Sequence, residues 1–291
     1  MSPMPRIDLH THSNASDGTD TPAQLVANAA RAGLGVVALT DHDTTAGYAE
    51  AAAALAALPA EAPLGTVVPG AELSTRHGEL SVHLLAYLFD PAHAELVREM
   101  ELLRTDRVRR AREMTEKCVA LGAPISWPQV ERIAAGGAVG RPHVASALVE
   151  AGVVGSVSEA FVPDWLGAGG RAYVHKRDLD AEYAVRLVRE AGGVPVVAHP
   201  AAAVRGGVLT DEQIAALAAV GLAGLEADHP DQSPPERARI RGLAAELGLI
   251  TTGSSDYHGG RKTIAIGAES TAPEALEALL AQATGNKPLT R

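Results

Sequence analysis

Short apolar segments alternate with helical segments along most of this 291-residue chain, and this alternation limits the possible folds more than any other feature. The segments GVVALTDHD from Gly35, GVPVVAHP from Gly193 and GLITTGSSDYHG from Gly248 are typical of buried strands that run into polar residues. Helices are expected over 21–33, 44–58, 180–192, 210–220 and 234–247. Roughly seven strands alternating with helices predict an α/β fold with a parallel sheet, either open or closed into a barrel.

The stretch from about Pro91 to Arg177 interrupts this alternation of strands and helices. It begins with a long charged helical segment and continues as short helical pieces separated by glycine and proline. Apolar periodicity persists there, so the stretch is expected to be an inserted helical cap domain (residues 91–177) and not a linker. The main α/β domain then comprises residues 1–90 and 178–285, and residues 286–291 are expected to form a flexible tail.

Charge and cysteine content exclude several functions. Lysine and arginine total 25 against 35 aspartates and glutamates, a net charge of −10 that disfavours long nucleic acids and anionic membranes as partners. Cys118 is the single cysteine, which rules out an internal disulfide and any cysteine-built metal site. With no signal peptide or long apolar segment evident, the protein is expected to be soluble and cytoplasmic. The number of subunits is left open.

The polar residues at the predicted strand ends form the candidate functional site. In RIDLHTH, side chains alternate between the two faces of a strand, so His10 and His12 can reach one point. Six of the 11 histidines belong to this set, together with carboxylates. The candidate ligands are His10, His12, Asp17, His42, Glu72, His83, His199, Asp256 and His258. Crowded imidazoles need partners for their ring nitrogens, and a nitrogen and oxygen donor set without sulfur suits a cluster of two or three divalent cations.

The ordered motifs DLHTHSNASDG, TDHD, the isolated Glu72 and His83, VAHP and SDYHG resemble those of the PHP superfamily, named for polymerase and histidinol phosphatase. The resemblance runs from about Arg6 to Gly259 and is closest to the TrpH-like metal-dependent phosphoesterases, which also show GRPH near Arg141. It implies a distorted (β/α)7 TIM-like barrel with three metal ions at one rim. The first ion would be held by His10, His12, Glu72 and Asp256, the second by Glu72, His83 and His199, and the third by Asp17, His42 and His258. Mn2+, Fe2+, Zn2+ and Mg2+ are the candidate ions, and the carboxylate of Asp17 makes an all-zinc site less favourable.

The resemblance also implies a mechanism in which a hydroxide held between two cations attacks phosphorus. Glu72 and Asp256 are the catalytic carboxylates in this scheme, and His229 is a candidate either to protonate the leaving oxygen or to contact the nucleoside. Substrate binding is expected from Arg141, His143, Lys176 and Arg205, because cations and a helix start suit a phosphate.

The expected activity is hydrolysis of phosphate monoesters of small nucleotides, either nucleoside 3′,5′-bisphosphates or monophosphates. The alternatives are 5′-to-3′ exonuclease activity on short RNA, histidinol-phosphate phosphatase activity, and a non-catalytic, degenerate metal-binding regulatory protein. Oligonucleotides of a few units remain compatible with the net charge of −10.

Overall fold

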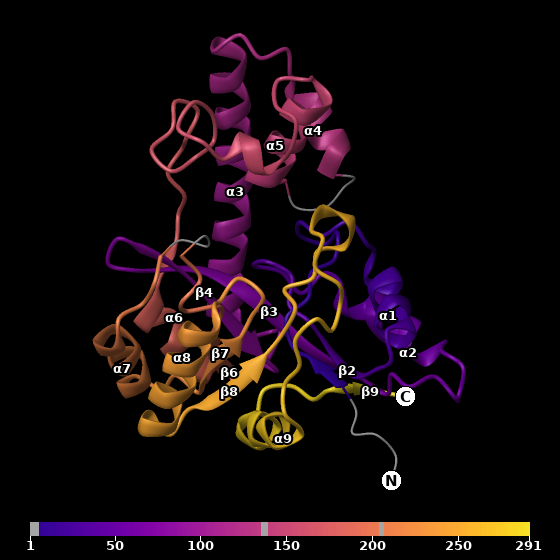
Figure 1. Ribbon diagram of the computed structural model, residues 1–291. Helices are drawn as coiled ribbons and strands as arrows, with labels where there is room; N and C mark the ends of the chain where they lie inside the picture. The colour runs from indigo at the N-terminus through magenta and orange to yellow at the C-terminus, as the bar shows by residue number, and fades with distance from the viewer. Residues whose placement is uncertain (1–5, 135–138, 204–206) are drawn as a thin grey trace.

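The computed structural model describes residues 6–134, 139–203 and 207–291 (Figure 1). Most of the strands join one mixed sheet in the order β1-β2-β3-β4-β6-β7-β8, with β5 and β9 each paired to β3. The strands are β1 (Arg6–Asp8), β2 (Leu34–Leu39), β3 (Thr66–His77), β4 (Leu80–Tyr87), β5 (Leu179–Asp180), β6 (Val194–Val197), β7 (Gly224–Asp228), β8 (Ile250–Gly253) and β9 (Leu289–Thr290). The α/β class expected from the alternation is therefore confirmed.

The all-parallel sheet expected from that alternation is wrong at β4, which pairs antiparallel with both β3 and β6. Only Gly78 and Glu79 separate β3 from β4, and Gly78 has a φ of 58°. A two-residue connection with a left-handed glycine makes a hairpin, so the two strands must run in opposite directions.

The two ends of the sheet, β1 and β8, meet through a single bridge between Thr11 and Tyr257 just beyond the strands. The amide of His12 donates a hydrogen bond to the carbonyl of Tyr257 at 2.8 Å. Strand pairing over the described residues thus forms an open path with one link between its ends, and it does not establish a closed (β/α)7 barrel.

Helices cover the sheet and bury its apolar residues. They are α1 (Pro22–Arg31), α2 (Tyr48–Ala56), α6 (Ala181–Glu190), α7 (Asp211–Ala219), α8 (Pro234–Leu247) and α9 (Pro273–Gln282). Helix α1 begins with the expected capping box, in which Thr21 and Gln24 bond each other's backbone amides. Helix α2 begins four residues later than expected, at Tyr48. One apolar cluster joins α1 and α2 to β2 and β3, and another joins α6, α7 and α8 to the sheet.

The central part of the chain is helical. It contains α3 (Ala94–Ala120), α4 (Trp127–Ala134), α5 (Arg141–Glu150) and the 3-10 turn η1 (Ser158–Ala160). Helix α3 connects two cores: Leu96 and Met100 pack in the cluster of the sheet, whereas Met114 and Cys118 pack in a separate cluster with α4 and α5. Figure 1 shows α4, α5 and the far end of α3 standing apart from the sheet.

The C-terminus differs from the flexible tail expected over 286–291. Leu289 and Thr290 form β9, which pairs antiparallel with Val67 and Thr66 of β3. The side chain of Arg291 donates hydrogen bonds to the carbonyls of Pro59 and Ala62. No helix of the described residues is long and apolar enough to cross a membrane.

Candidate metal centre

The expected ligands come together from segments that are far apart in the sequence. His10 and His12 follow β1, Asp17 lies in the next loop, and His42 follows β2. His199 follows β6, and Asp256 and His258 follow β8. Glu72 and His83 differ from the expected placement after a strand, because they lie within β3 and β4. The long β3 carries Glu72 into the site, where His42 forms a parallel bridge to it.

Backbone strain is concentrated in this region. Among the described residues other than glycine, four have positive φ, and three of them lie in the site: Asp43 at 54°, His199 at 33° and Asp256 at 53°. Such conformations persist only where the surroundings impose them, and they occur often at functional sites.

Glu72 is the centre of the cluster, because five histidines approach its two carboxylate oxygens. The distances to Oε2 are 3.2 Å from His10 Nε2, 3.0 Å from His12 Nε2 and 3.3 Å from His42 Nδ1. The distances to Oε1 are 2.6 Å from His83 Nδ1 and 3.4 Å from His199 Nε2. The Glu72 side chain is 2% exposed, so this carboxylate lies beneath the surface.

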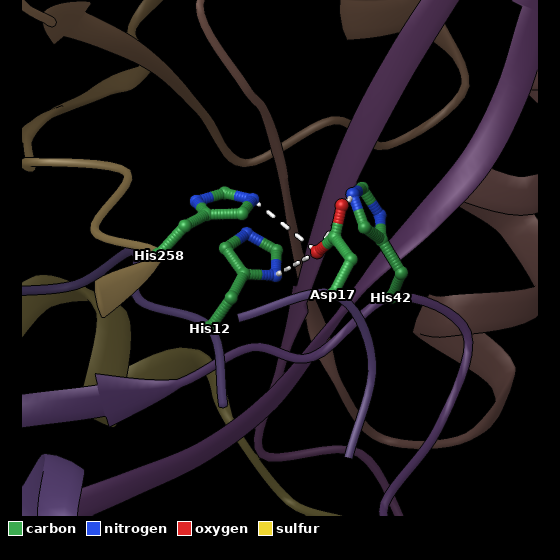
Figure 2. A group of neighbouring side chains, drawn as sticks. All are labelled: His12, Asp17, His42 and His258. Carbon is green, nitrogen blue, oxygen red and sulfur yellow. Dashed lines mark ion pairs between the residues drawn. The ribbon is translucent and has the colours of Figure 1, made fainter. Parts of the chain in front are cut away.

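Asp17 forms a second centre with three of the histidines (Figure 2). Its Oδ1 lies 3.3 Å from His258 Nε2, 3.9 Å from His12 Nδ1 and 4.0 Å from His42 Nε2. His12 and His42 therefore face both Asp17 and Glu72, which places the two carboxylates in one continuous cluster.

Asp256 uses its two oxygens differently. Oδ1 faces the cluster, at 3.5 Å from His10 Nε2 and 3.4 Å from His12 Nε2. Oδ2 accepts a hydrogen bond from Lys262 Nζ at 2.6 Å and lies 3.5 Å from His229 Nε2.

The electrostatics of the cluster keep its carboxylates ionised. Burial alone would raise the pKa of Glu72, but attraction to His42 and His83 lowers that pKa well below its usual range. Burial is likewise outweighed at Asp17, whose pKa is lowered by His258 and His42. At His199, burial lowers the pKa to about 4, so this imidazole is neutral and able to bind a cation at neutral pH.

The donor atoms fit divalent cations. His12 Nδ1, Asp17 Oδ1 and His42 Nδ1 are buried and have no hydrogen-bond partner among the described residues. His10 Nε2 and His12 Nε2 face each other at 3.0 Å beside two carboxylates, an arrangement that a shared cation would satisfy. Three overlapping groups have ligand atoms within 4.8 Å of one another: His10, His12, Glu72 and Asp256; His12, Asp17, His42 and His258; and His42, Glu72 and His83.

Two buried carboxylates, Glu226 and Asp41, support the cluster but are not among the expected ligands. Glu226 of β7 accepts a hydrogen bond from His10 Nδ1 at 3.0 Å and another from the amide of His199 at 2.8 Å. Asp41 accepts hydrogen bonds from Ser13 and Ser16, at the start of the loop that carries Asp17. The available signal for Glu226 was a charged residue between Leu225 and Ala227, inside a strand that ends at Asp228.

The expected substrate-binding residues lie in different surroundings. The guanidinium of Arg141 stacks over the ring of Phe161, 4.8 Å from its centroid. His143 is buried in the first turn of α5. The ammonium group of Lys176 lies 2.8 Å from both Ser81 Oγ and Asp178 Oδ1. Arg205 lies outside the described residues.

Comparison with known proteins identifies the family of this chain. The PHP domain model matches residues 8–122. A 5′-3′ exoribonuclease of Haemophilus influenzae is 32% identical over 253 residues, covering 87% of this chain and 90% of that protein. A 3′,5′-nucleoside bisphosphate phosphatase of Chromobacterium violaceum is 33% identical over 263 residues, covering 88% of each chain.

A solved structure from Bifidobacterium adolescentis, provisionally assigned as a metal-dependent phosphoesterase, superposes with a TM-score of 0.89 at 35% identity, covering 97% of this chain and 98% of that one. Fold, site and relatives define the class as metal-dependent phosphoesterase. This chain belongs to the PHP domain family.

Proposed function

We propose that this protein hydrolyses phosphate monoesters of small nucleotides, either nucleoside 3′,5′-bisphosphates or nucleoside monophosphates. The observation that carries the proposal is the convergence of five histidines on the buried carboxylate of Glu72, with Asp17 continuing the same cluster. The similarity to a nucleoside bisphosphate phosphatase over 88% of the chain supports the substrate class.

In this proposal the cluster holds two or three divalent cations, with Mn2+, Fe2+, Zn2+ and Mg2+ as candidates. The first ion takes His10, His12, Glu72 and Asp256, a set supported by the proximity of their ligand atoms. The second takes Glu72, His83 and His199, and the third takes Asp17, His42 and His258. His12 and His42 lie close enough to serve neighbouring ions, because each faces both Glu72 and Asp17.

Bound cations supply positive charge for the phosphate oxygens and lower the pKa of water. Glu72 and Asp256 contribute negative charge that holds the cations, and Glu226 orients His10 by accepting the hydrogen bond from its Nδ1. His229 is the proposed proton donor to the leaving oxygen. Its Nδ1 accepts a hydrogen bond from the amide of Asp231 at 3.0 Å, which places the proton of the neutral ring on Nε2. That nitrogen is directed toward Asp256, at the edge of the cluster.

The helical region over residues 91–177 is the proposed substrate-binding cap, and residues 1–90 with 178–285 form the proposed barrel-like domain. The separate apolar cluster of α4 and α5 supports an independent unit. The bridge between Thr11 and Tyr257 favours a sheet that curves toward closure, as in a distorted (β/α)7 barrel. Arg141, His143, Lys176 and Arg205 remain the proposed substrate contacts.

A second activity, 5′-to-3′ trimming of short RNA, is favoured by the similarity to the Haemophilus influenzae exoribonuclease over 87% of the chain. The reaction also breaks a phosphate ester, so one metal centre serves both activities.

The test is to purify the protein, measure its bound metals by mass spectrometry, and assay release of phosphate or nucleotide. The panel is a 3′,5′-bisphosphate, a 5′-monophosphate, histidinol phosphate and short RNA. We expect the highest kcat/KM on the bisphosphate or monophosphate, and loss of turnover in Glu72→Gln and His199→Ala. Absence of turnover on the whole panel with metals bound would refute the proposal, and a higher kcat/KM on RNA would favour the second activity.

A further inference from the structure

Arg261 is an arginine whose surroundings differ from those of the structural arginines in this chain. It ends the short 3-10 turn η3 (Gly259–Arg261), directly after His258. Its Nε and Nη1 are buried and have no hydrogen-bond partner among the described residues. By contrast, Arg237 donates to the carbonyls of Gln232 and His229 and pairs with Glu269 at 2.7 Å. Covered guanidinium nitrogens without acceptors are costly, so an anionic ligand is the simplest partner for Arg261.

The turn that carries Arg261 is held beside the loop of Asp17. The amide of Gly260 donates to Thr19 Oγ1 at 2.8 Å, and the amide of Thr19 donates to the carbonyl of His258 at 3.1 Å. Gly259 has a φ of 66°, and a Cβ there would come within 2.1 Å of Thr19 Oγ1. This close fit holds the start of the turn against the loop that carries Asp17, and the described residues show no ion pair between Arg261 and Asp17. The acidic side chain raises the pKa of Arg261, while burial, the larger influence, lowers it.

His143 approaches the same region from the helical part of the chain. Its Nδ1 accepts a hydrogen bond from the amide of Gly140 at 3.0 Å, so the proton of the neutral ring is on Nε2. Burial lowers the pKa of His143 to about 4, and the charge of Arg261 is the next largest cause. The imidazole is therefore a neutral N–H donor within the electrostatic reach of Arg261. In Figure 1 the turn after β8 rises toward α4 and α5.

We propose that Arg261 and His143 together bind the phosphoryl group of the substrate at the Asp17 end of the metal centre. Nε and Nη1 of Arg261 form a planar fork that matches two phosphate oxygens, and His143 Nε2 supplies a third donor. Arg261 follows β8 and His143 lies in the first turn of α5. A phosphate bound by both would therefore link the sheet to the helical region. The inference rests on the proposed function, in that the ligand is a phosphate ester.

Inorganic phosphate is the probe for this site, because its binding can be measured without turnover. Equilibrium dialysis would compare wild type, Arg261→Ala, Arg261→Lys and His143→Ala, each with metals loaded and again after chelation. Arg241→Ala is the matched control, since Arg241 is an exposed arginine of α8 that pairs with Asp228. Metal content and thermal unfolding would be recorded for every variant.

We expect Arg261→Ala to weaken phosphate binding roughly 10- to 100-fold, since hydrogen bonds to charged groups are lost. Arg261→Lys should recover part of the loss, because it keeps the charge but not the fork. His143→Ala should show a smaller loss, and Arg241→Ala none. Free guanidinium ion should partly restore phosphate binding in Arg261→Ala, an effect that a merely structural arginine would not show.

The inference is overturned if wild type binds no phosphate, or if a folded Arg261→Ala variant with normal metal content binds it as tightly as wild type. These results are distinct from failure of the proposed function. A protein that binds phosphate through Arg261 but hydrolyses nothing on the panel would contradict the function and retain the site. Unaffected turnover in Arg261→Ala would contradict the phosphate site and retain the proposed function.

Discussion

At the scale of single residues, Glu226 controls how His10 is presented. One oxygen accepts a hydrogen bond from His10 Nδ1, and the other accepts one from the amide of His199. Both residues belong to the proposed ligand set. A carboxylate behind a ligating histidine fixes the tautomer and orientation of the ring.

Glu226→Gln should therefore weaken metal binding. Glutamine has one carbonyl oxygen and one NH2 group. The NH2 group would therefore face either His10 Nδ1–H or the amide N–H of His199, and that donor would lose its acceptor. We expect roughly a 10- to 100-fold loss of metal affinity, measured by competition with a chelating dye. Glu182→Gln, on the surface of α6, is the control and should not change the affinity. An unchanged affinity in Glu226→Gln would show that this carboxylate does not orient the ligands.

His143 should give stability a measurable dependence on pH. Burial holds its pKa at about 4 in the folded protein, below the value of 6.5 expected for the unfolded chain. Between these values the unfolded state binds more protons, so the contribution of His143 to stability rises with pH and levels off above about pH 7.

The test is urea unfolding of wild type and His143→Asn from pH 4 to 8 with chelator present, so that loss of cations does not contribute. Relative to the variant, wild type should gain up to roughly 3 kcal/mol of unfolding free energy across this range. Parallel curves for the two proteins would contradict the assignment of a neutral, buried His143.

The sequence could indicate residues that coordinate but not residues that support them. His10 and His12 were recognisable because strand alternation places them on one face, and the later histidine motifs repeated the pattern. Glu226 and Arg261 lacked such a signal, because a buried carboxylate in a strand or an arginine after a motif acquires its role only through tertiary contacts. The position of Glu72 within β3 was also missed, since strand length depends on the pairing with β4.

At the scale of secondary-structure elements, α3 links the helical region to the metal centre. Arg107 of α3 donates from Nη2 to Asp43 Oδ2 at 2.6 Å and to Ser74 Oγ at 2.8 Å. Asp43 has a side chain that is 0% exposed and is adjacent to His42 in the chain. The helix thus neutralises a buried carboxylate beside a proposed ligand.

Removing this contact should destabilise the protein strongly. Arg107→Ala would leave the Asp43 carboxylate buried with the amide and hydroxyl of Ser74 as its only donors among the described residues, at a cost of about 3–5 kcal/mol. Arg109→Ala is the control, because Arg109 forms exposed pairs within α3 and should cost at most about 1 kcal/mol. Urea denaturation measures both, and similar losses in the two variants would contradict the role given to Arg107.

The helices were the easiest elements to predict, because caps and apolar periodicity are local. Helix α1 begins at its capping box, and α8 covers the expected residues 234–247. The direction of a strand relative to its neighbours could not be predicted from its local sequence. The connection between β3 and β4 is short enough to require a hairpin, yet the general alternation of strands and helices favoured a parallel sheet. The pairing of β9 with β3 could not be predicted either, because the two residues of β9 are too few to show an alternating pattern.

At the scale of the whole molecule, the metal centre lies where the two ends of the sheet meet. His12 follows β1 and His258 follows β8. Their neighbours Thr11 and Tyr257 form the bridge that joins the two ends of the sheet. Cations bound there would connect segments separated by most of the chain. They would also bring counter-charge to Glu72, Asp17 and Asp256, which are buried together.

Metal removal should therefore lower the global stability of the protein. Ligands that bind only the folded state stabilise it by mass action, by about 2.7 kcal/mol when the free cation is at 100 times its dissociation constant. For a chain of this size, we expect the midpoint of thermal unfolding to fall by roughly 5–10 °C on chelation and to recover when Mn2+ is restored.

Glu72→Gln separates this effect from a nonspecific action of the chelator. The variant loses the carboxylate on which five histidines converge, so chelation should barely change its unfolding midpoint. Calorimetry with parallel metal analysis measures both proteins. Identical unfolding curves for metal-loaded and metal-free wild type would show that the cluster does not couple the ends of the sheet through bound cations. If wild type and Glu72→Gln lose equal stability on chelation, the stabilising ions bind at a site other than Glu72.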